Sequence, residues 1–259
     1  MLEVESRTDV GIRRQINEDH LHADRVRGLL LVCDGMGGHA GGELAARLAV
    51  ETITAFVERT RGGVAGPLPY PVDPGLPPET NRLAMAIRVA NAEIFNVASR
   101  NPALAGMGST VAGIIVDRTH AHIAHVGDSR VYRWRGDRLE CLTRDHSALN
   151  ELLDRGELRP EEAALYPDQN TITRALGTEP DVRVDVRVER LKEGDVFLLC
   201  TDGLTDHVSD RKLAECLTAA WQRDSRGMRL EWLAGELVRL ANAKGGHDNI
   251  TLVLARYTD

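Results

Sequence analysis

The chain contains 259 residues, of which 42% are hydrophobic and 27% charged, and 32 basic against 39 acidic residues give it a formal charge of −7. This length suits one large domain or two small ones, and the composition excludes a disordered chain, a collagen and a coiled coil. The acidic balance argues against a protein that binds nucleic acid through its phosphates. We therefore expect a globular protein without a nucleic acid partner.

The N-terminal segment and the cysteines indicate a cellular compartment. Residues 1–10 contain neither the basic region nor the apolar run of a secretory signal, and no segment approaches about 18 uninterrupted apolar residues. The cysteines lie far apart in the sequence and form no C-x-x-C pair. They are Cys33, Cys141, Cys200 and Cys216. We expect a cytoplasmic protein with free thiols, without a membrane partner and without a zinc site.

The first part of the chain predicts one buried strand and two helices. Residues 29–33 form a short apolar run that ends at Asp34 and Gly35. Apolar residues at helical spacing predict helices over residues 40–58 and 81–99. Six of the ten prolines lie between these helices, in residues 61–79. We interpret this segment as a stiff surface loop rather than a linker between domains, because both flanking helices look like parts of one unit.

The second part of the chain begins with β-structure. Apolar runs joined by short turns predict antiparallel strands at residues 109–116, 121–126, 130–134 and 138–142. Further strands are expected at residues 182–188, where valine alternates with charged residues, at 196–201 and at 250–257. Leucines at helical spacing predict two helices between the last two strands. Strand blocks alternating with helix pairs indicate a single α+β domain with sheets packed face to face and helices outside.

Acidic residues stand at the ends of the apolar strands. Asp34, Asp128 and Asp202 each follow such a strand, and Asp248 precedes the final one. A carboxylate at the edge of a buried sheet costs desolvation energy unless a cation or a hydrogen-bond donor compensates it. Four such residues indicate either a shared cation site or four independent turn caps, and spacing alone does not decide between these. An all-oxygen ligand set would favour Mg²⁺ or Mn²⁺ over Zn²⁺.

Two other kinds of site compete with a metal site. The glycine-rich residues 35–42 follow a strand and open a helix, which loosely fits a dinucleotide-binding fingerprint. Asp34 would then face the pyrophosphate, and the acid expected after a second parallel strand is missing. Ser129 resembles a hydrolase nucleophile and would need a histidine base. By position, the candidate bases are His146, His207 and His247. A serine that shapes a tight turn is the simpler interpretation.

Seven short motifs, in this order, resemble those of the bacterial metal-dependent protein phosphatases of type 2C. They are TDVGIRRQINED (8–19), VCDGMGG (32–38), GMGST (106–110), VGDSR (126–130), TRALG (173–177), TDGL (201–204) and GHDNIT (246–251). Each motif alone is weak, but all seven in one order over nearly the whole chain are highly specific. The resemblance implies a four-layer α-β-β-α sandwich of two antiparallel sheets flanked by helix pairs.

The same resemblance implies roles for individual residues. Asp34 would bridge two divalent ions, Mn²⁺ or Mg²⁺, and the carbonyl of Gly35 would bind one of them. Asp202 and Asp248 would bind the other ion. Asp128, together with Asp202, would bind a third and weaker ion.

Three more residues complete the implied site. Glu18 and Asp19 would hold waters on the ions or hold the ligands themselves, and Arg14 would bind the substrate phosphate in a planar, bidentate way. A hydroxide bridging two ions would attack the phosphorus of phosphoserine or phosphothreonine in proteins, without a covalent intermediate. Such an enzyme would counteract Ser/Thr kinase signalling, and its partners would be phosphorylated proteins, such as a Ser/Thr kinase and its substrates.

The resemblance also sets the expected domain plan and leaves one role open. It implies one domain over residues 1–259, with the surface loop at 61–79 and a flap at about 146–171 beside the active site. Some members carry a histidine directly after the Asp-Gly pair, as the acid that protonates the leaving group. This chain has Met36 there, so either a water on the ions or His39 would supply the proton. A non-catalytic regulator of the same fold would lack a ligand aspartate, and none is missing.

Overall fold

The computed structural model describes residues 1–37, 40–62, 68–167, 171–222 and 229–258. Its strands are β1 (Leu2–Asp9), β2 (Asp19–Asp24), β3 (Leu29–Met36), β4 (Gly108–Ser109), β5 (Val111–Val116), β6 (His120–Val126), β7 (Arg130–Arg135), β8 (Arg138–Cys141), β9 (Asp185–Arg190), β10 (Val196–Cys200) and β11 (Ile250–Tyr257). Its helices are α1 (Ala40–Thr60), α2 (Pro78–Arg100), α3 (Ala148–Asp154), α4 (Asp202–Thr205), α5 (Asp210–Gln222) and α6 (Leu230–Ala243), with 3₁₀ turns at Pro102–Leu104 and Pro160–Leu165.

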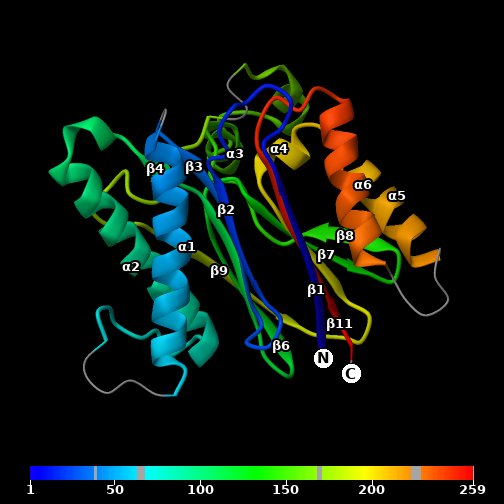
Figure 1. The fold of residues 1–259 in the computed structure, drawn as a ribbon, viewed down its shortest axis with the longest axis horizontal. Helices are drawn as coiled ribbons and strands as arrows, with labels where there is room; N and C mark the ends of the chain where they lie inside the picture. Colours follow the sequence, from blue (N-terminus) through cyan, green and yellow to red (C-terminus); the bar gives the residue numbers. More distant parts are fainter. Residues whose placement is uncertain (38–39, 63–67, 168–170, 223–228, 259) are drawn as a thin grey trace.

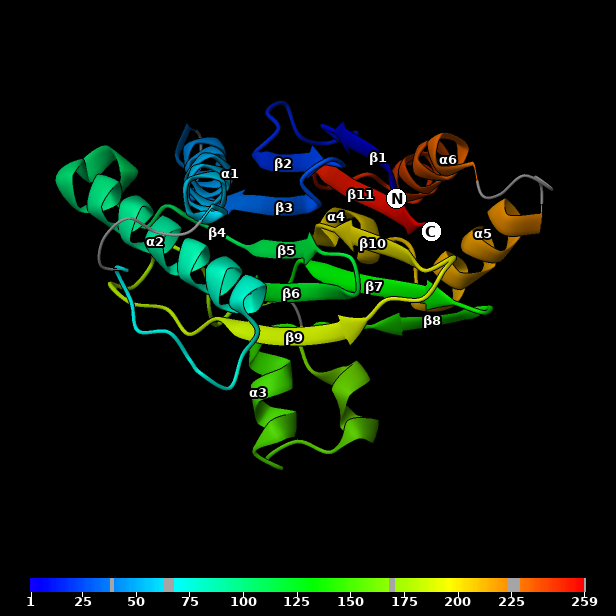
Figure 2. The same cartoon turned by 90° about the horizontal axis from the view of Figure 1, so that it is seen from below.

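Two antiparallel sheets stack face to face with helices on both outer sides (Figures 1 and 2). One sheet has the strand order β1-β11-β10-β7-β8, and the other has the order β2-β3-β5-β6-β9 with β4 paired to β3. Helices α1 and α2 pack on the second sheet, while α5 and α6 pack on the first. A third apolar cluster lies between the sheets. The predicted α+β sandwich of four layers is confirmed.

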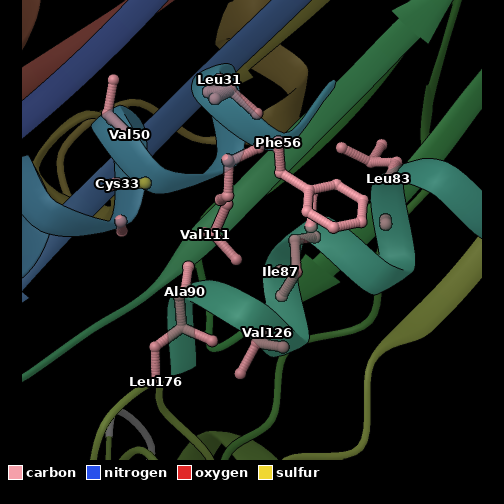
Figure 3. Packing of buried hydrophobic residues seen from close by; sticks show 14 of the residues in the cluster. Leu31, Cys33, Val50, Phe56, Leu83, Ile87, Ala90, Val111, Val126 and Leu176 are labelled. Carbon is pink, nitrogen blue, oxygen red and sulfur yellow. The ribbon is translucent and has the colours of Figure 1, made fainter. Parts of the chain in front are cut away.

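Strand β3 shows why the buried runs are continuously apolar rather than alternating. Its residues Leu29, Leu31 and Cys33 pack under α1 and α2, as Figure 3 shows for the last two. Its residues Leu30 and Val32 point the other way, into the cluster between the sheets. Because successive side chains of a strand point to opposite faces, a strand buried on both faces must be apolar at every position. This pattern fixes β3 in the middle of the molecule and leaves Asp34 at its end.

The structure corrects several sequence-based boundaries. Helix α2 begins at Pro78, three residues before the predicted start, because a proline fits the first turn of a helix, where its missing N–H is not needed. The strand predicted at 109–116 is two strands, β4 and β5. The edge strand β1 was not predicted, and neither was β2. Their side chains are only partly buried, so the apolar signal in both segments is weak.

The strand directions exclude the dinucleotide-binding alternative. Strand β3 pairs antiparallel with β2, β4 and β5, so no parallel β-α-β crossover follows the glycine-rich segment. The four cysteines are free thiols, as expected. None of the helices within the described ranges has the length and hydropathy that crossing a membrane requires.

A pair of glycine substitutions tests the packing of the TRALG motif on α2. Gly177 has φ +83°, and a Cβ at this position would lie 2.2 Å from Cγ2 of Ile94. We expect Gly177→Ala to destabilise the protein by about 2 kcal/mol or more, from backbone strain and overpacking. The control is Gly235→Ala in α6, where an added Cβ would have no atom within 4 Å apart from the neighbouring backbone of its own helix, and the change should stabilise by about 1 kcal/mol. Urea denaturation measures both, and equal effects would contradict this packing.

Candidate metal centre

The ends of β2, β3 and β10 and the start of β11 bring four acidic residues to one edge of the molecule. Asp19 of β2 lies in register with Asp34 of β3. Asp202 opens α4 directly after β10, and Asp248 precedes β11 by two residues. In Figure 1 this edge is the upper one, where β3, β4 and α4 lie together, away from the two chain ends. The structure thus brings together three of the four strand-end acids, Asp34, Asp202 and Asp248, and adds Asp19, whereas Asp128 lies in a neighbouring pocket.

Burial and mutual repulsion perturb these carboxyl groups strongly. Burial raises the pKa of Asp34 well above its ordinary value, and the negative charges of Asp19, Asp202 and Asp248 raise that pKa further. Burial raises the pKa of Asp19 to about 7 and, together with the charge of Asp206, the pKa of Asp202 to about 6. Acids so close together favour a proton or a cation between them. The cluster is therefore not a set of independent turn caps.

Unpaired oxygens show that the site fits a hard divalent cation. The buried atoms Asp19 Oδ1, Asp128 Oδ1 and Asp202 Oδ1 have no hydrogen-bond partner. A buried carboxylate oxygen without a partner costs desolvation energy, which a Mn²⁺ or Mg²⁺ ion would offset. Within the described ranges, no group of three or more His, Cys, Asp and Glu side chains is placed so that it could hold a metal ion. Asp248 is engaged by protein donors at both oxygens: Oδ2 accepts from Arg14, and Oδ1 accepts from the backbone N–H of Asn249.

A polar layer behind the carboxylates holds them in place. Thr201 Oγ1 donates a 2.9 Å hydrogen bond to Asp19 Oδ2. The side chain of Asn249 accepts from the backbone N–H of Glu18 at 2.8 Å and donates to the carbonyls of Val10 and Ile16. Thr201 and Asn249 are both buried. The sequence analysis did not single them out, although both lie inside the matching motifs beside an aspartate.

Arg14 and Glu18 lie on the loop that Asn249 anchors. Arg14 Nη2 is 2.7 Å from Asp248 Oδ2, and its Nη1 is 3.8 Å from Glu18 Oε2. The Arg14 side chain is 47% exposed, so its guanidinium can meet an anion that arrives from solvent. Burial raises the pKa of Glu18. The structure thus places a cation on the solvent side of the acidic cluster.

Asp128 belongs to a neighbouring acidic pocket that also includes Asp202 and Asp206. Asp145 lines this pocket too, but Arg130 neutralises it through hydrogen bonds of 2.6 to 3.1 Å. Burial, and then the charges of Asp202 and Asp145, raise the pKa of Asp128 to about 7. Asp206 was missed by the sequence analysis. Its position four residues after Asp202, at the end of a helical turn, is the signal that could have placed it on the same side.

Ser129 is not arranged as a nucleophile. Its side chain is 1% exposed, and its Oγ lies 2.7 Å from Oγ1 of Thr110, which in turn accepts from the N–H of Asp34 at 3.0 Å. The nearest of its candidate bases in sequence, His146, instead accepts a hydrogen bond from the Gly127 amide. Among the contacts of the described residues, Ser129 therefore pairs with a hydroxyl and not with a histidine base, which contradicts the serine hydrolase alternative.

Gly35 in β3 lies against the first turn of α1 and against the loop that carries Glu18. A Cβ on Gly35 would lie 2.0 Å from the carbonyl oxygen of Gly42 and 2.6 Å from that of Glu18, so only glycine fits there. The terminal methyl of Met36 lies near Gly108 and carries no exchangeable proton. His39, the other candidate for proton donation, lies outside the described residues.

The raised pKa values predict how stability depends on pH in EDTA. Carboxyl groups that titrate near pH 6 to 7 when folded and near pH 4 when unfolded bind more protons in the folded state between these values. The free energy of unfolding should therefore fall as the pH rises from about 5 to about 8. Asp128→Asn should flatten this slope, and Mn²⁺ should raise stability at pH 8 by binding the ionised carboxylates. Urea titrations at each pH measure the free energy of unfolding and so its slope against pH. Parallel curves for the wild type and Asp128→Asn would contradict the raised pKa of Asp128.

Comparisons with known proteins agree with this geometry. A family model described as protein phosphatase 2C matches residues 11–238. The chain is 34% identical to the serine/threonine protein phosphatase PstP of Mycobacterium tuberculosis, across 100% of this chain and 46% of that protein. It is 33% identical to the protein phosphatase PhpP of Streptococcus pneumoniae, across 98% of this chain and 96% of that protein. The chain thus spans about half the length of PstP and nearly all of PhpP.

Solved structures show the same arrangement. A crystal structure of M. tuberculosis PstP has a TM-score of 0.83 and 33% identity, and covers 100% of this chain and 99% of that one. A structure of the PstP catalytic domain in complex with two manganese ions has a TM-score of 0.80 and 33% identity, with the same coverage of both chains. With the family model matching most of its length and relatives above 30% identity along it, this chain belongs to the protein phosphatase 2C family.

Proposed function

We propose that this chain hydrolyses phosphoserine and phosphothreonine in proteins, using Mn²⁺ or Mg²⁺. The observation that carries the proposal is the set of buried, unpaired carboxylate oxygens on Asp19, Asp128 and Asp202, with Arg14 on their solvent side. An acidic cluster alone would repel a phosphate dianion. The same cluster loaded with cations, beside a guanidinium, attracts one.

We assign the metal ligands as follows. Asp34 and the carbonyl of Gly35 would hold one ion, and Asp34 with Asp202 and Asp248 would hold the second. Asp128 and Asp202 would hold a third and weaker ion. When bound, such ions activate a water as nucleophile and offset the charge of the phosphate. Asp19 is fixed by Thr201 and so has one oxygen left to hold a water or a ligand.

The protein's own side chains then bind and orient the phosphate. Arg14 can offer two parallel N–H donors to two phosphate oxygens, a geometry that a lysine could not reproduce. Its hydrogen bond with Asp248 at 2.7 Å would position the guanidinium next to the metal ligands. Glu18 lies 3.8 Å from the same guanidinium and would restrict its motion from the other side.

We also propose a domain plan, a substrate class and partners for this chain. We infer one catalytic domain over residues 1–259 that includes the surface loop at 61–79 and a flap at about 146–171 beside the active site. The pairing of β1 with β11, which joins the two ends of the chain in one sheet, supports this. Phosphorylated proteins would be its substrates, and a Ser/Thr kinase and the substrates of that kinase, in the cytoplasm, would be its partners. A regulator without catalysis is disfavoured because every ligand carboxylate is present.

The metal requirement tests the proposal most simply. Metal-stripped protein should be inactive on p-nitrophenyl phosphate and on a phosphothreonine peptide, and Mn²⁺ or Mg²⁺ should restore both activities. Asp202→Asn should lower kcat by several orders of magnitude because it removes one of the charges that hold the ions. Asp137→Asn in the turn between β7 and β8 is the control and should keep full activity. Full activity in EDTA, or in Asp202→Asn with saturating Mn²⁺, would contradict the assignment.

A second test addresses Arg14. Arg14→Ala should lower kcat/KM by an amount equivalent to about 1.5–3 kcal/mol, the typical value for a hydrogen bond to a charged group, and should weaken inhibition by inorganic phosphate. Arg13→Ala, its exposed neighbour, serves as the matched control and should change neither value. If both variants behave alike, Arg14 does not bind the phosphate.

A further inference from the structure

A buried histidine outside the carboxylate cluster is bonded to the turn that carries Asp128. The backbone N–H of His146 donates to the carbonyl of Gly127 at 3.0 Å. In return the N–H of Gly127 donates to Nδ1 of the His146 ring, also at 3.0 Å. The side chain is 7% exposed, so water competes little for these bonds. Both polar groups of the Gly127 backbone are thereby satisfied by one residue.

Gly127 itself has little freedom. Its φ is +99°, and a Cβ at this position would lie 2.7 Å from Cβ and Cγ2 of Thr110. The glycine is thus held between Thr110 on one side and the His146 ring on the other. Since Asp128 follows directly, the position of its carboxylate depends on where Gly127 is held. The Oδ1 atom of Asp128 is buried and unpartnered, so no other protein group fixes that oxygen.

The His146 ring is fixed from its other sides. With Nδ1 accepting from Gly127, the neutral ring carries its proton on Nε2, which faces Oδ2 of Asp185 at 3.4 Å. Nη1 of Arg174 lies 2.8 Å from the same Nε2, as a contact between two donor groups. Arg174 also donates to Oδ1 of Asp185 at 3.0 Å. The ring stacks on that of His125 at 4.7 Å and 14°, and His125 is held in turn by the carbonyl of Arg144. Burial, then the charges of His125 and Arg174, lower the pKa of His146 to about 4, in keeping with an unprotonated Nδ1 that accepts from Gly127.

The same residue also joins both ends of a surface segment. The carbonyl of His146 accepts from the N–H of Thr173 at 2.9 Å, and the N–H of Ala148 donates to the carbonyl of Thr171 at 2.9 Å. Helix α3 lies in the chain between these two pairs. The hydrogen bonds therefore connect the base of this segment to the Asp128 turn through one residue, His146, by both its backbone and its ring.

We propose that His146 is a positioning residue that sets the affinity of Asp128 for the third metal ion. The inference rests on the proposed function, because that function assigns an ion to Asp128. Residues that orient a metal ligand without touching the metal typically change metal affinity by about 10- to 100-fold when replaced. His146 bonds the backbone of Gly127 and not Asp128 itself, so its effect on the ligand is less direct. We therefore expect the lower end of that range.

The experiment measures Mn²⁺ binding directly, by electron paramagnetic resonance of the free ion, alongside phosphopeptide hydrolysis and thermal unfolding. His146→Ala should weaken the weakest class of bound Mn²⁺ about tenfold and leave the tighter ions unchanged. His146→Asn keeps an acceptor near the position of Nδ1 and should recover most of this affinity. The Mn²⁺ concentration needed for phosphopeptide hydrolysis should shift in the same way.

The matched control is His122→Ala. His122 is 2% exposed and lies in the same strand as His125, but it bonds to Thr80 and Asp117, away from Asp128. It should lower the melting temperature without changing Mn²⁺ binding. An equal shift of Mn²⁺ binding in His122→Ala would show a general effect of stability and overturn the positioning role.

The Asp128→Ala variant distinguishes a failure of the proposed third ion site from a failure of the positioning role of His146. If it leaves the weak class of Mn²⁺ unchanged, the third ion in the proposed function is wrong. If it removes that class while His146→Ala and His146→Asn both bind like the wild type, only the positioning role is wrong. In the Asp128→Ala background, His146→Ala should have no further effect on Mn²⁺ binding. A full additional effect there would place the action of His146 elsewhere.

Discussion

The structure depends on how the charge of several buried carboxyl groups is compensated. Four of them meet where the two sheets end, namely Asp19, Asp34, Asp202 and Asp248. The charges of the other three raise the pKa of Asp34, and the pKa values of Asp19 and Asp202 are raised as well. Part of the compensation is built into the protein: Thr201 bonds Asp19, and Arg14 bonds Asp248. The remaining unpaired oxygens need a cation or a proton. The fold therefore accepts a local loss of stability at the place that we propose as the ion and substrate site.

The two-sheet scaffold explains how residues far apart in sequence reach one site. Antiparallel strands place chain reversals at the sheet ends, and the carboxylates stand just before or after such reversals. Asn249 ties the loop of residues 10–18 to the start of β11, so Arg14 and Glu18 are positioned by the C-terminal strand. The three apolar clusters, two between helices and sheets and one between the sheets, then keep these ends fixed, because β3 and β10 are buried on both faces.

Much of the fold and of the candidate site could be predicted from the sequence, for physical reasons that differ between elements. The apolar runs at β3 and β10 and the acids that end them are strong local signals, since a strand buried on both faces tolerates no polar residue. Strands β1 and β2 lack that signal because their side chains are only partly buried. Thr201 and Asn249 stand beside motif aspartates and Asp206 stands four residues after Asp202, but these positions do not reveal the contacts that each residue makes only after folding. The role of His146 is hidden for a similar reason, because Gly127 and Asp185 lie 19 and 39 positions away.

The central claim is that the strand-end carboxylates of this chain bind divalent cations together. A crystal structure of the protein grown with Mn²⁺ and measured at the manganese absorption edge tests it most directly, because anomalous scattering locates the ions without assuming their ligands. Our account predicts two strong peaks beside Asp34, Asp202 and Asp248, a weaker one beside Asp128, and an Asp248 carboxylate turned toward an ion. Ordered crystals with saturating Mn²⁺ in which no peak lies against these carboxylates would contradict it.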